Sequence, residues 1–317
     1  QRSAARLLEL AREQLRLTGY EDLSLLSLSA SDHPQLPELL AALLTEHAPS
    51  RVSISLPSLR VEHLDGTLGE YLRRVRRSGF TLAPEAGSER LRRVINKRYR
   101  EEELLRAVRN VVAAGVDSLK FYFMIGLPTE TDDDVAAIAE LTNRLLGAAH
   151  GVRRSAQLTA SISTFVPKPH TPFQWAAAPS LEEIGRRQRL LVARTPRRVR
   201  LKWHDAGQSY VESLLARADR RFAAVLDRLV PPEHPALEAW SEHFSLARWQ
   251  EALSAAAAAG EIPDPAVYLA ARDPAAPLPW DGIDVGVTKA YLRSELAASL
   301  PEIERPDCSD GPCDDCG

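Results

Sequence analysis

The sequence feature that most constrains the fold is a regular alternation of short apolar segments with longer amphipathic ones. The short apolar segments, which predict strands, lie at residues 23–28, 51–56, 79–83, 119–125 and 157–166. Segments with leucine and alanine at helical spacing, which predict helices, lie at residues 1–17, 36–47, 68–78, 89–114 (with a break) and 132–149. Because each helix returns the chain to the same end of the sheet, this alternation predicts an α/β fold with a parallel sheet, curved or closed.

The order of these segments predicts one more strand than the chain shows. The series opens with a helix, although a crossover helix packs back on the sheet only after a preceding strand. A strand is therefore expected upstream of Gln1, which with the five visible strands makes six. The chain begins with glutamine and its single methionine is Met124, so we expect the natural start to lie upstream as well.

The character of the sequence changes at Leu181. From there on, the sequence predicts helices and loops rich in proline, tryptophan and alanine, and the alanine-rich stretch before Gly260 predicts a helix that ends at that glycine. We therefore expect two parts, an α/β core at residues 1–200 and a mainly helical accessory segment at residues 201–317.

The composition is that of a folded globular protein without a strong charge bias. The 317 residues are 44% hydrophobic and 26% charged, and the formal net charge is -3. Arginine-rich clusters at residues 73–77 and 197–202 are interpreted as solvated helix faces, with an RNA or ribosomal target as a hypothesis. No segment approaches the ~20 apolar residues of a membrane helix, and no signal peptide is visible, so we expect a cytoplasmic protein without a membrane partner.

Polar residues follow two of the predicted strands at the ends where parallel α/β folds bind ligands. Ser29 and Ser31 follow the first strand, and Ser31 is also able to cap the next helix. Glu85 and Ser88 follow the third strand, and the helix capped by Ser88 would expose N–H groups that suit a carboxylate or phosphate. At both strand ends, a turn with a helix cap is the alternative to a ligand site.

The fourth strand ends in a sequence of restricted backbone geometry. Gly126, Leu127 and Pro128 follow it directly, and here glycine would let a ligand approach the backbone while proline stiffens the exit. Thr131 and Asp134 are spaced as in a helix capping box. A cap accounts for the threonine but not for the glycine and proline after an apolar strand.

The fifth strand leads into a segment that is rich in proline and aromatic residues. Val166 and Pro167 begin this segment, which also holds His170, Phe173 and Trp175. Such a rigid platform suits a flat ring that stacks on it. His170 by itself is interpreted as a structural or surface histidine.

Taken together, the three later strand ends resemble the radical S-adenosylmethionine superfamily. The resemblance rests on Ala-Pro-Glu-Ala-Gly-Ser-Glu-Arg-Leu at residues 83–91, Ile-Gly-Leu-Pro-Thr-Glu-Thr at residues 125–131 and Pro-Lys-Pro-His-Thr-Pro-Phe at residues 167–173. It covers most of residues 1–200, and the branch it resembles is the elongator-subunit and methylthiotransferase type. More narrowly, the chain is similar to uncharacterised bacterial proteins with a cobalamin-binding domain ahead of the radical core, although Ala216 and Ala218 stand where those proteins tend to have serine and glycine.

The resemblance implies a partial (β/α)6 barrel, without its first strand in this sequence, and an enzyme that cleaves S-adenosylmethionine. In the superfamily, a [4Fe–4S] cluster on a Cys-x3-Cys-x2-Cys loop after the first strand binds S-adenosylmethionine, and one electron from a donor cleaves it to a 5′-deoxyadenosyl radical. By analogy, the radical would serve a methylation or methylthiolation-like modification of an unknown substrate, with cobalamin bound by an upstream domain.

The resemblance also implies which strand ends contact S-adenosylmethionine, while no catalytic residue is assigned. The methionine amino group would be bound by Ser29 and Ser31, where other branches have glycines and a glutamate. The ribose or the methionine carboxylate would be bound by Glu85 and Ser88. The adenine would be bound along its edge by Gly126, Leu127 and Pro128 and on its face by Val166 and Pro167.

All three cysteines lie near the end of the chain, and residues 1–307 contain none. The spacing of Cys308, Cys313 and Cys316 differs from that of the superfamily's cluster loop, so we expect a second metal site there, for zinc or an auxiliary iron–sulfur cluster. A tail with unliganded thiols is the alternative. The ligands of the radical cluster are expected outside these 317 residues.

Two other hypotheses about the function are left open. The first is a non-catalytic interaction module that keeps the barrel scaffold but has lost the cluster loop. The second is an aldolase-like (β/α)8 barrel, against which the five strand signals and the lack of a phosphate-binding loop argue.

Overall fold

The computed structural model describes residues 2–27, 33–50, 52–55, 79–230 and 243–306. The strands are β1 (Asp22–Ser24), β2 (Ser53–Ser55), β3 (Phe80–Glu85), β4 (Ser118–Ile125), β5 (Gln157–Thr164) and β6 (Arg200–Trp203). The first helices are α1 (Ala4–Thr18), α2 (Leu36–His47), α4 (Glu89–Val94), α5 (Glu101–Ala113), α6 (Asp132–Val152) and α7 (Leu181–Arg194). The later helices are α8 (Ala206–Arg217), α9 (Ala223–Leu229), α10 (Leu246–Ala258), α11 (Pro265–Leu269) and α12 (Lys289–Ser299), and short 3-10 helices lie at η2 (Ala48–Ser50) and η4 (Arg220–Phe222).

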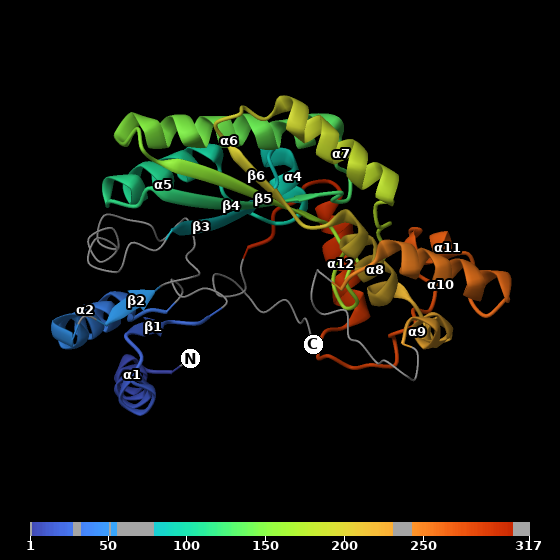
Figure 1. The fold of residues 1–317 in the computed structure, drawn as a ribbon, viewed down its shortest axis with the longest axis horizontal. Coiled ribbons are helices and arrows are strands. Elements are labelled where there is room, and N and C mark those ends of the chain that lie inside the picture. Colours follow the sequence, from blue (N-terminus) through green and yellow to red (C-terminus); the bar gives the residue numbers. More distant parts are fainter. Residues whose placement is uncertain (1, 28–32, 51, 56–78, 231–242, 307–317) are drawn as a thin grey trace.

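All strand pairs in the described residues are parallel, which confirms the predicted α/β fold. β1 pairs with β2, and β3, β4, β5 and β6 form a second sheet in the order of the sequence (Figure 1). No hydrogen bond joins the two sheets within the described part of the chain. Closure into a partial (β/α)6 barrel and the strand upstream of Gln1 stay predictions.

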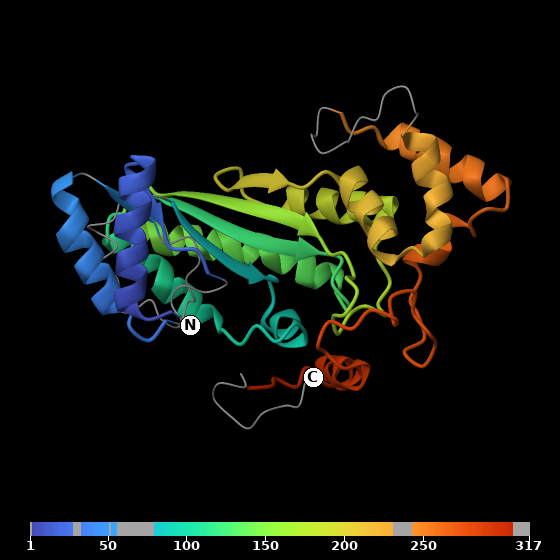
Figure 2. The ribbon, with the colours of Figure 1, turned by 90° about the horizontal axis from the view of Figure 1, so that it is seen from below.

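The four-stranded sheet is covered by helices on one face. In Figure 1, α5, α6 and α7 lie over this face, and Figure 2 shows the strands from the opposite side. Phe121, Phe123 and Ile125 of β4 are at most 1% exposed and belong to the main core beneath these helices. Alternate residues of the same strand, Tyr122 and Met124, are only partly buried. The sheet therefore has one apolar, helix-covered face and one more open face.

Most of the predicted elements are present, including the break within residues 89–114, and they differ in some details. The segment predicted as a broken helix at residues 89–114 consists of α4 and α5. β3 extends to Glu85 through a register shift between Leu82 and Glu85. β6 was not predicted and crosses the expected boundary between residues 200 and 201, while the division into two domains itself stays a prediction. The predicted helix at residues 68–78 lies outside the described residues.

The segment after β6 is mainly helical, as predicted, and packs at one end of the sheet (Figures 1 and 2). α8 to α11 bury a core of their own, and a smaller cluster joins Trp175, in the segment after β5, to Trp280 and Leu292. No helix in the described ranges is long and apolar enough to cross a membrane.

Arg217 at the end of α8 fastens this segment to the segment after β5. Its fully buried guanidinium donates to the backbone carbonyls of Gln174 at 3.1 Å, Ala176 at 2.7 Å, Tyr268 at 2.6 Å and Ala270 at 2.6 Å. Burial, with a smaller contribution from the nearby Arg272, lowers its pKa to about 10. Arginine suits this position because its planar fork carries five donors.

The end of the described chain is fastened to α4. Asn96, just after α4, donates from Nδ2 to the carbonyl of Arg305 at 3.2 Å and accepts from its N–H at 3.1 Å. Glu302 forms an ion pair with Arg93 at 2.7 Å. The chain that leads to the cysteine-rich tail therefore runs beside the first helix after β3.

We expect Arg217→Met to lower the free energy of unfolding by about 3 kcal/mol, because four backbone carbonyls, two of them on the buried residues Gln174 and Tyr268, lose a charged donor. Arg220→Met is the matched control, since Arg220 is exposed three residues further on. Urea denaturation of both variants measures the difference. Equal stability of the two variants would contradict the role assigned to Arg217.

Candidate functional site

The carboxyl ends of β3, β4 and β5 meet at one edge of the sheet. Glu85 is paired with Phe123, and Ile125 is paired with Thr164. Directly beyond, the N–H of Phe165 donates to the carbonyl of Ile125 at 2.9 Å. The structure thus brings together the predicted residues of three strand ends, namely Glu85, Ser88, Gly126, Leu127, Pro128, Val166 and Pro167. Ser29, Ser31, Cys308, Cys313 and Cys316 lie outside the described residues.

Glu85 ends β3 in an unusual backbone conformation. Its φ is 67°, in the left-handed region that non-glycine residues rarely occupy. Its side chain is 23% exposed, and the Nζ of Lys97 lies 3.7 Å from its Oε1. Burial raises the pKa of Glu85, and the charge of Lys97 acts in the opposite direction. Strain of this kind is concentrated at functional sites, which agrees with the position predicted for a ligand.

Gly87 lets the turn after β3 lie directly against α6. A Cβ at this position would be 2.2 Å from the backbone nitrogen of Ile138 and 2.5 Å from the carbonyl carbon of Ala137. Because both atoms belong to the backbone of a helix, a side chain cannot be accommodated by a rotamer change. Glycine at this position therefore sets the distance between the β3 end and α6.

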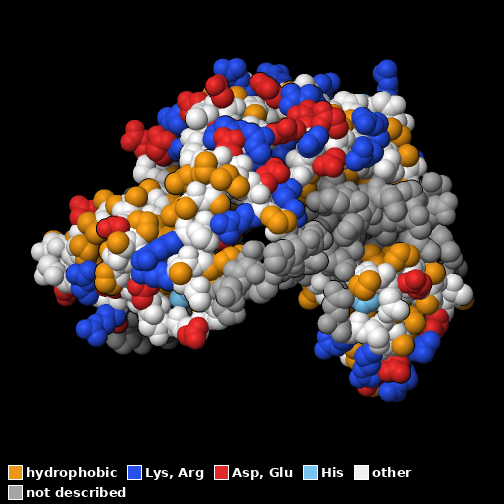
Figure 3. All heavy atoms as spheres, turned by 180° about the vertical axis from the view of Figure 1, so that it is seen from behind, with side chains coloured by type: hydrophobic (Ala, Val, Ile, Leu, Met, Phe, Trp, Pro, Cys, Tyr) orange, Lys and Arg blue, Asp and Glu red, His pale blue; other side chains and the backbone are white. Residues whose placement is uncertain are grey.

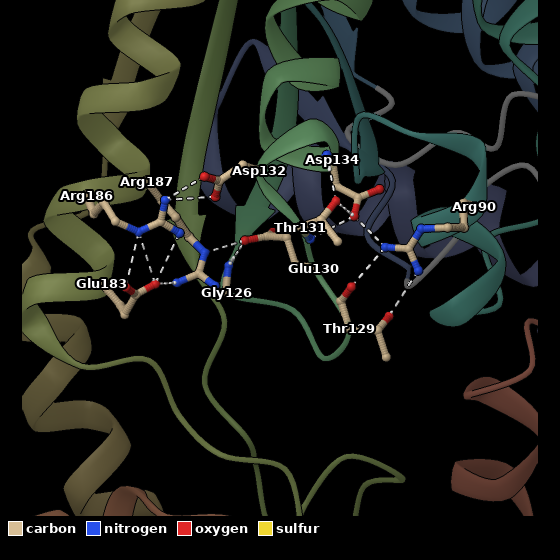
Figure 4. Close-up of polar contacts among 10 residues, drawn as sticks. All are labelled: Arg90, Gly126, Thr129, Glu130, Thr131, Asp132, Asp134, Glu183, Arg186 and Arg187. Carbon is tan, nitrogen blue, oxygen red and sulfur yellow. Dashed lines mark hydrogen bonds and ion pairs between the residues drawn. The ribbon is translucent and has the colours of Figure 1, made fainter.

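A buried carboxylate, Asp134, holds the turns after β3 and β4 together (Figure 4). Its oxygens accept from the hydroxyl of Ser88 at 2.5 Å, from the N–H and hydroxyl of Thr131 at 2.8 Å each, and from the guanidinium of Arg90. Arg90 also donates to the carbonyl of Thr129 at 2.9 Å. Burial opposes ionisation of Asp134, but the hydrogen bonds outweigh it and lower its pKa.

The contacts of Asp134 confirm the predicted capping box and define the position of Ser88. Thr131 caps α6, with reciprocal hydrogen bonds between Thr131 and Asp134. Ser88 caps α4 by accepting from the N–H of Leu91 at 3.1 Å. Its hydroxyl thus both caps the helix and donates to Asp134, and its contact with a ligand stays a prediction.

A second buried carboxylate, Glu130, fixes the backbone after β4 (Figure 4). Its side chain is 1% exposed, and its Oε1 accepts from the N–H of Gly126 at 2.8 Å and pairs with the Nε of Arg187 at 2.7 Å. Burial raises the pKa of Glu130 to about 7, although Gly126 and Arg187 favour the charged form. Gly126 has a φ of 88°, and a Cβ there would lie 2.8 Å from the Cγ of Pro179.

Ion pairs continue from Glu130 along the surface of α7. Arg187 also pairs with Glu183 at 2.5 Å, and Arg186 pairs with Glu183 at 3.1 Å and with Asp132 at 2.8 Å (Figure 4). The start of α6 is thereby tied to α7 as well as to α4. Gly126 and Asp134 were expected from the sequence. The roles of Glu130, Arg90 and the α7 arginines were not, because ion pairs such as Glu130–Arg187 and Arg90–Asp134 join residues that are distant in sequence.

An apolar cluster lies beneath the three strand ends. Its buried members are Ala86, Leu91, Val94, Leu127 and Phe165, and Phe173 packs against them. Phe165 and Phe173 meet edge to face with ring centroids 6.0 Å apart. Pro167 is buried and Val166 is partly buried beside this cluster. This edge therefore combines a buried apolar cluster with the strained backbone and partly buried carboxylate of Glu85. Such a combination suits a ligand with a flat ring and polar groups.

His170 is part of the structural loop after β5. Its N–H donates to the Oε1 of Gln174 at 3.1 Å, and the same oxygen accepts from the indole of Trp280 at 2.6 Å. Within the described residues, no group of three or more His, Cys, Asp or Glu side chains is arranged to hold a metal ion.

Comparison with known proteins matches the first part of the chain to a family. Residues 1–142 match the sequence model of the radical SAM superfamily. Over 226 residues, the chain is 30% identical to an uncharacterised protein of Methanocaldococcus jannaschii, an alignment that covers 70% of this chain and 47% of that protein. The chain thus spans about half the length of this relative.

Gly87→Ala is expected to lower the free energy of unfolding by about 2–3 kcal/mol, because the new methyl group meets the backbone of α6. Gly147→Ala is the matched control within α6, where a Cβ would meet no described atom within 4 Å. This control should raise stability by about 0.5–1 kcal/mol, since glycine is a poor helix former. Chemical denaturation measures both, and a stable Gly87→Ala variant would argue against the close approach.

We expect the stability contribution of Glu130 to depend on pH. Its pKa of about 7 lies above that of an exposed glutamate, so the folded state holds the proton more tightly than the unfolded state does. The free energy of unfolding of the wild type, relative to Glu130→Gln, should therefore fall by up to about 3 kcal/mol as the pH rises from about 4.5 to about 7.5.

Denaturation curves across this pH range measure the effect. Glu182→Gln, at an exposed position on α7, should instead follow the wild type at every pH. A wild type and a Glu130→Gln variant with parallel pH profiles would show that Glu130 is not a buried, protonatable group.

Proposed function

Because residues 1–142 match the radical SAM superfamily, we propose that the protein is the core of an enzyme that positions S-adenosylmethionine for reductive cleavage. The observation that supports this proposal best is the shared edge formed by the ends of β3, β4 and β5. Ligands of parallel α/β folds bind at this end of the strands. The edge offers a carboxylate on strained backbone at Glu85, a glycine at Gly126 and a buried apolar cluster within one site.

The residues present fit S-adenosylmethionine at the three described strand ends. Glu85 and Ser88 would bind the ribose or the methionine carboxylate, and Lys97 offers a cation beside Glu85. Gly126, Leu127 and Pro128 would lie along the adenine edge, with Val166 and Pro167 on its face. The apolar cluster around Leu127 and Phe165 suits a flat ring. Ser29 and Ser31 are retained as proposed contacts of the methionine amino group.

The residues present do not fit a [4Fe–4S] cluster of the radical type, since residues 1–307 contain no cysteine. We propose that its ligands lie in a Cys-x3-Cys-x2-Cys loop outside the 317 residues. Together with S-adenosylmethionine and an electron donor, such a cluster supplies a 5′-deoxyadenosyl radical. The contribution of this chain is to bind and orient S-adenosylmethionine and to keep water from it.

The two buried carboxylates act as positioning residues in this proposal. Asp134 holds the turn that carries Glu85 and Ser88, while Glu130 fixes the backbone amide of Gly126. Both carboxylates are shielded from water, so their hydrogen bonds hold the strand ends in one arrangement. A ligand would therefore meet preformed backbone rather than a loop that must be ordered.

Finer aspects of the function follow from the family resemblance alone. The reaction would be a methylation or methylthiolation-like modification, with cobalamin bound by an upstream domain and the protein in the cytoplasm. Cys308, Cys313 and Cys316 would hold zinc or an auxiliary iron–sulfur cluster. The described residues before this tail, which end at Pro306, run beside α4.

Anaerobic reconstitution of the full-length gene product with iron and sulfide, followed by reduction, tests the proposal. We expect 5′-deoxyadenosine to form from S-adenosylmethionine, as measured by chromatography. Glu85→Gln should weaken S-adenosylmethionine binding about tenfold, because a charged acceptor is lost. Glu182→Gln should bind as the wild type does, since Glu182 lies exposed on α7.

The absence of 5′-deoxyadenosine from a protein with a spectroscopically proven cluster would overturn the proposal. An upstream gene sequence with a start codon near Gln1 and no cluster loop would do the same. Either result would favour the non-catalytic module that keeps the scaffold alone.

A further inference from the structure

The two faces of the four-stranded sheet differ in chemistry. Parallel sheets are normally covered on both faces, and their strands are then apolar throughout. Among the described residues, helices cover only the face beneath α5, α6 and α7. The opposite face, here called the open face, carries the alternate strand residues outside this core, which are mostly partly buried on β3, β4 and β5 and exposed on β6.

The strand register aligns the residues of the open face in rows across the sheet. One row consists of Thr81, Lys120, Thr159 and Arg200. The next row consists of Tyr122, Ser161 and Lys202, and a third pairs Met124 with Ser163. The first two rows thus contain three cations and four hydroxyl groups, and they contain no carboxylate.

The cations of the open face lack the partners that arginines have on the outside of the molecule. Over the helices that cover the sheet, Figure 3 shows Lys and Arg mixed with Asp and Glu, and there Arg144 pairs with Glu101 and Arg186 with Asp132. Within the described ranges, Lys120, Arg200 and Lys202 form no ion pair with an acidic side chain. This difference separates the open face from an ordinary solvated surface.

Lys120 does not lie on an edge strand, so it is not there to prevent the sheet from pairing with another sheet. Charged residues on edge strands commonly prevent sheets from pairing with one another, which accounts for Arg200 and Lys202 on β6. Lys120 lies on β4, between β3 and β5. Its Nζ donates to the hydroxyl of Tyr122 at 2.5 Å and lies 4.4 Å from the centre of that ring. An ammonium group has three donors, so two remain for a ligand.

We infer that the open face binds an oxyanion of the substrate, a phosphate or a carboxylate, between Lys120 and Lys202. This inference rests on the proposed function, because it places the substrate on the same sheet whose ends would hold S-adenosylmethionine. Two of the chain's five lysines lie on this face, although most basic residues of the chain are arginines. With strands about 4.8 Å apart and about 6.7 Å between alternate residues, the two Cα atoms are about 12 Å apart. Both side chains can therefore reach one bound oxyanion.

The hydroxyl groups between the two lysines complete the site. Ser161 is 7% exposed and lies between Tyr122 and Lys202 in its row. Ser163, one row nearer the carboxyl edge, donates to the carbonyl of Phe123 at 3.2 Å. Hydroxyls beside ammonium groups donate to anionic oxygens, and hydrogen bonds that involve a charged group are stronger than neutral ones. The site therefore favours an oxygen-rich anion over a neutral ligand.

Isothermal titration of the reconstituted full-length protein with pyrophosphate, and separately with citrate, tests this inference and distinguishes a phosphate from a carboxylate ligand. We expect one of the two to bind, and the double variant Lys120→Gln/Lys202→Gln to bind it at least about tenfold more weakly. Arg109→Gln removes the same charge from an exposed position on α5, across the sheet, and should change the affinity less than about twofold. Lys202→Gln alone, on the exposed edge strand, gives a variant whose folding is not in question.

Several outcomes would overturn the inference. One is that neither anion binds at millimolar concentration. Another is that the wild type and the double variant bind with the same affinity. A third is that Arg109→Gln loses as much affinity as the double variant does. Formation of 5′-deoxyadenosine by the same wild-type preparation is measured in parallel. If it forms while the anions fail to bind, only the oxyanion site is wrong; if it does not form with the cluster present, the proposed function is wrong.

Discussion

The arrangement of the candidate site depends on one buried carboxylate, Asp134. Its two oxygens receive hydrogen bonds from the turn after β3, from the first turn of α6 and from a guanidinium on α4. A carboxylate with so many donors stays ionised despite its burial, and so it holds three segments with a full charge. Gly87 allows the same segments to touch, because only a residue without a side chain fits against α6. The position of Glu85 relative to Gly126 follows from these two constraints.

The sheet has one apolar and one polar face, so its charged and hydroxyl side chains lie on a single side. The helices bury the large aromatic side chains of β4, which supplies the cohesion of the core. The opposite side is then free of this packing requirement, so lysine and hydroxyl residues are tolerated at most of its positions on β4 and β5. This division agrees with a protein that encloses a polar ligand beneath its sheet rather than between its helices.

The periodicity of the sequence was sufficient to predict the α/β fold, because strands such as residues 119–125 and helices such as residues 132–149 carry their own apolar pattern. β6 was missed because Arg200 and Lys202 alternate with Leu201 and Trp203, and four residues with two cations resemble a solvated cluster. The strand ends were predicted as ligand positions from glycine, proline and capping residues. Glu130 and Arg90 were missed, since a glutamate or arginine near a helix start is commonly exposed, and only the folded chain brings Arg187 and Asp134 to them.

Arg217 has a consequence for how a ligand reaches the site. Its guanidinium fixes carbonyls of the segment after β5 and of the end of α11 at the same time, and its acceptors among the described residues are all backbone carbonyls. A segment held at its backbone has lost most of its conformational entropy before any ligand arrives. Association on this side then carries a small ordering penalty, and the affinity of a ligand there reflects contact and desolvation rather than loop closure.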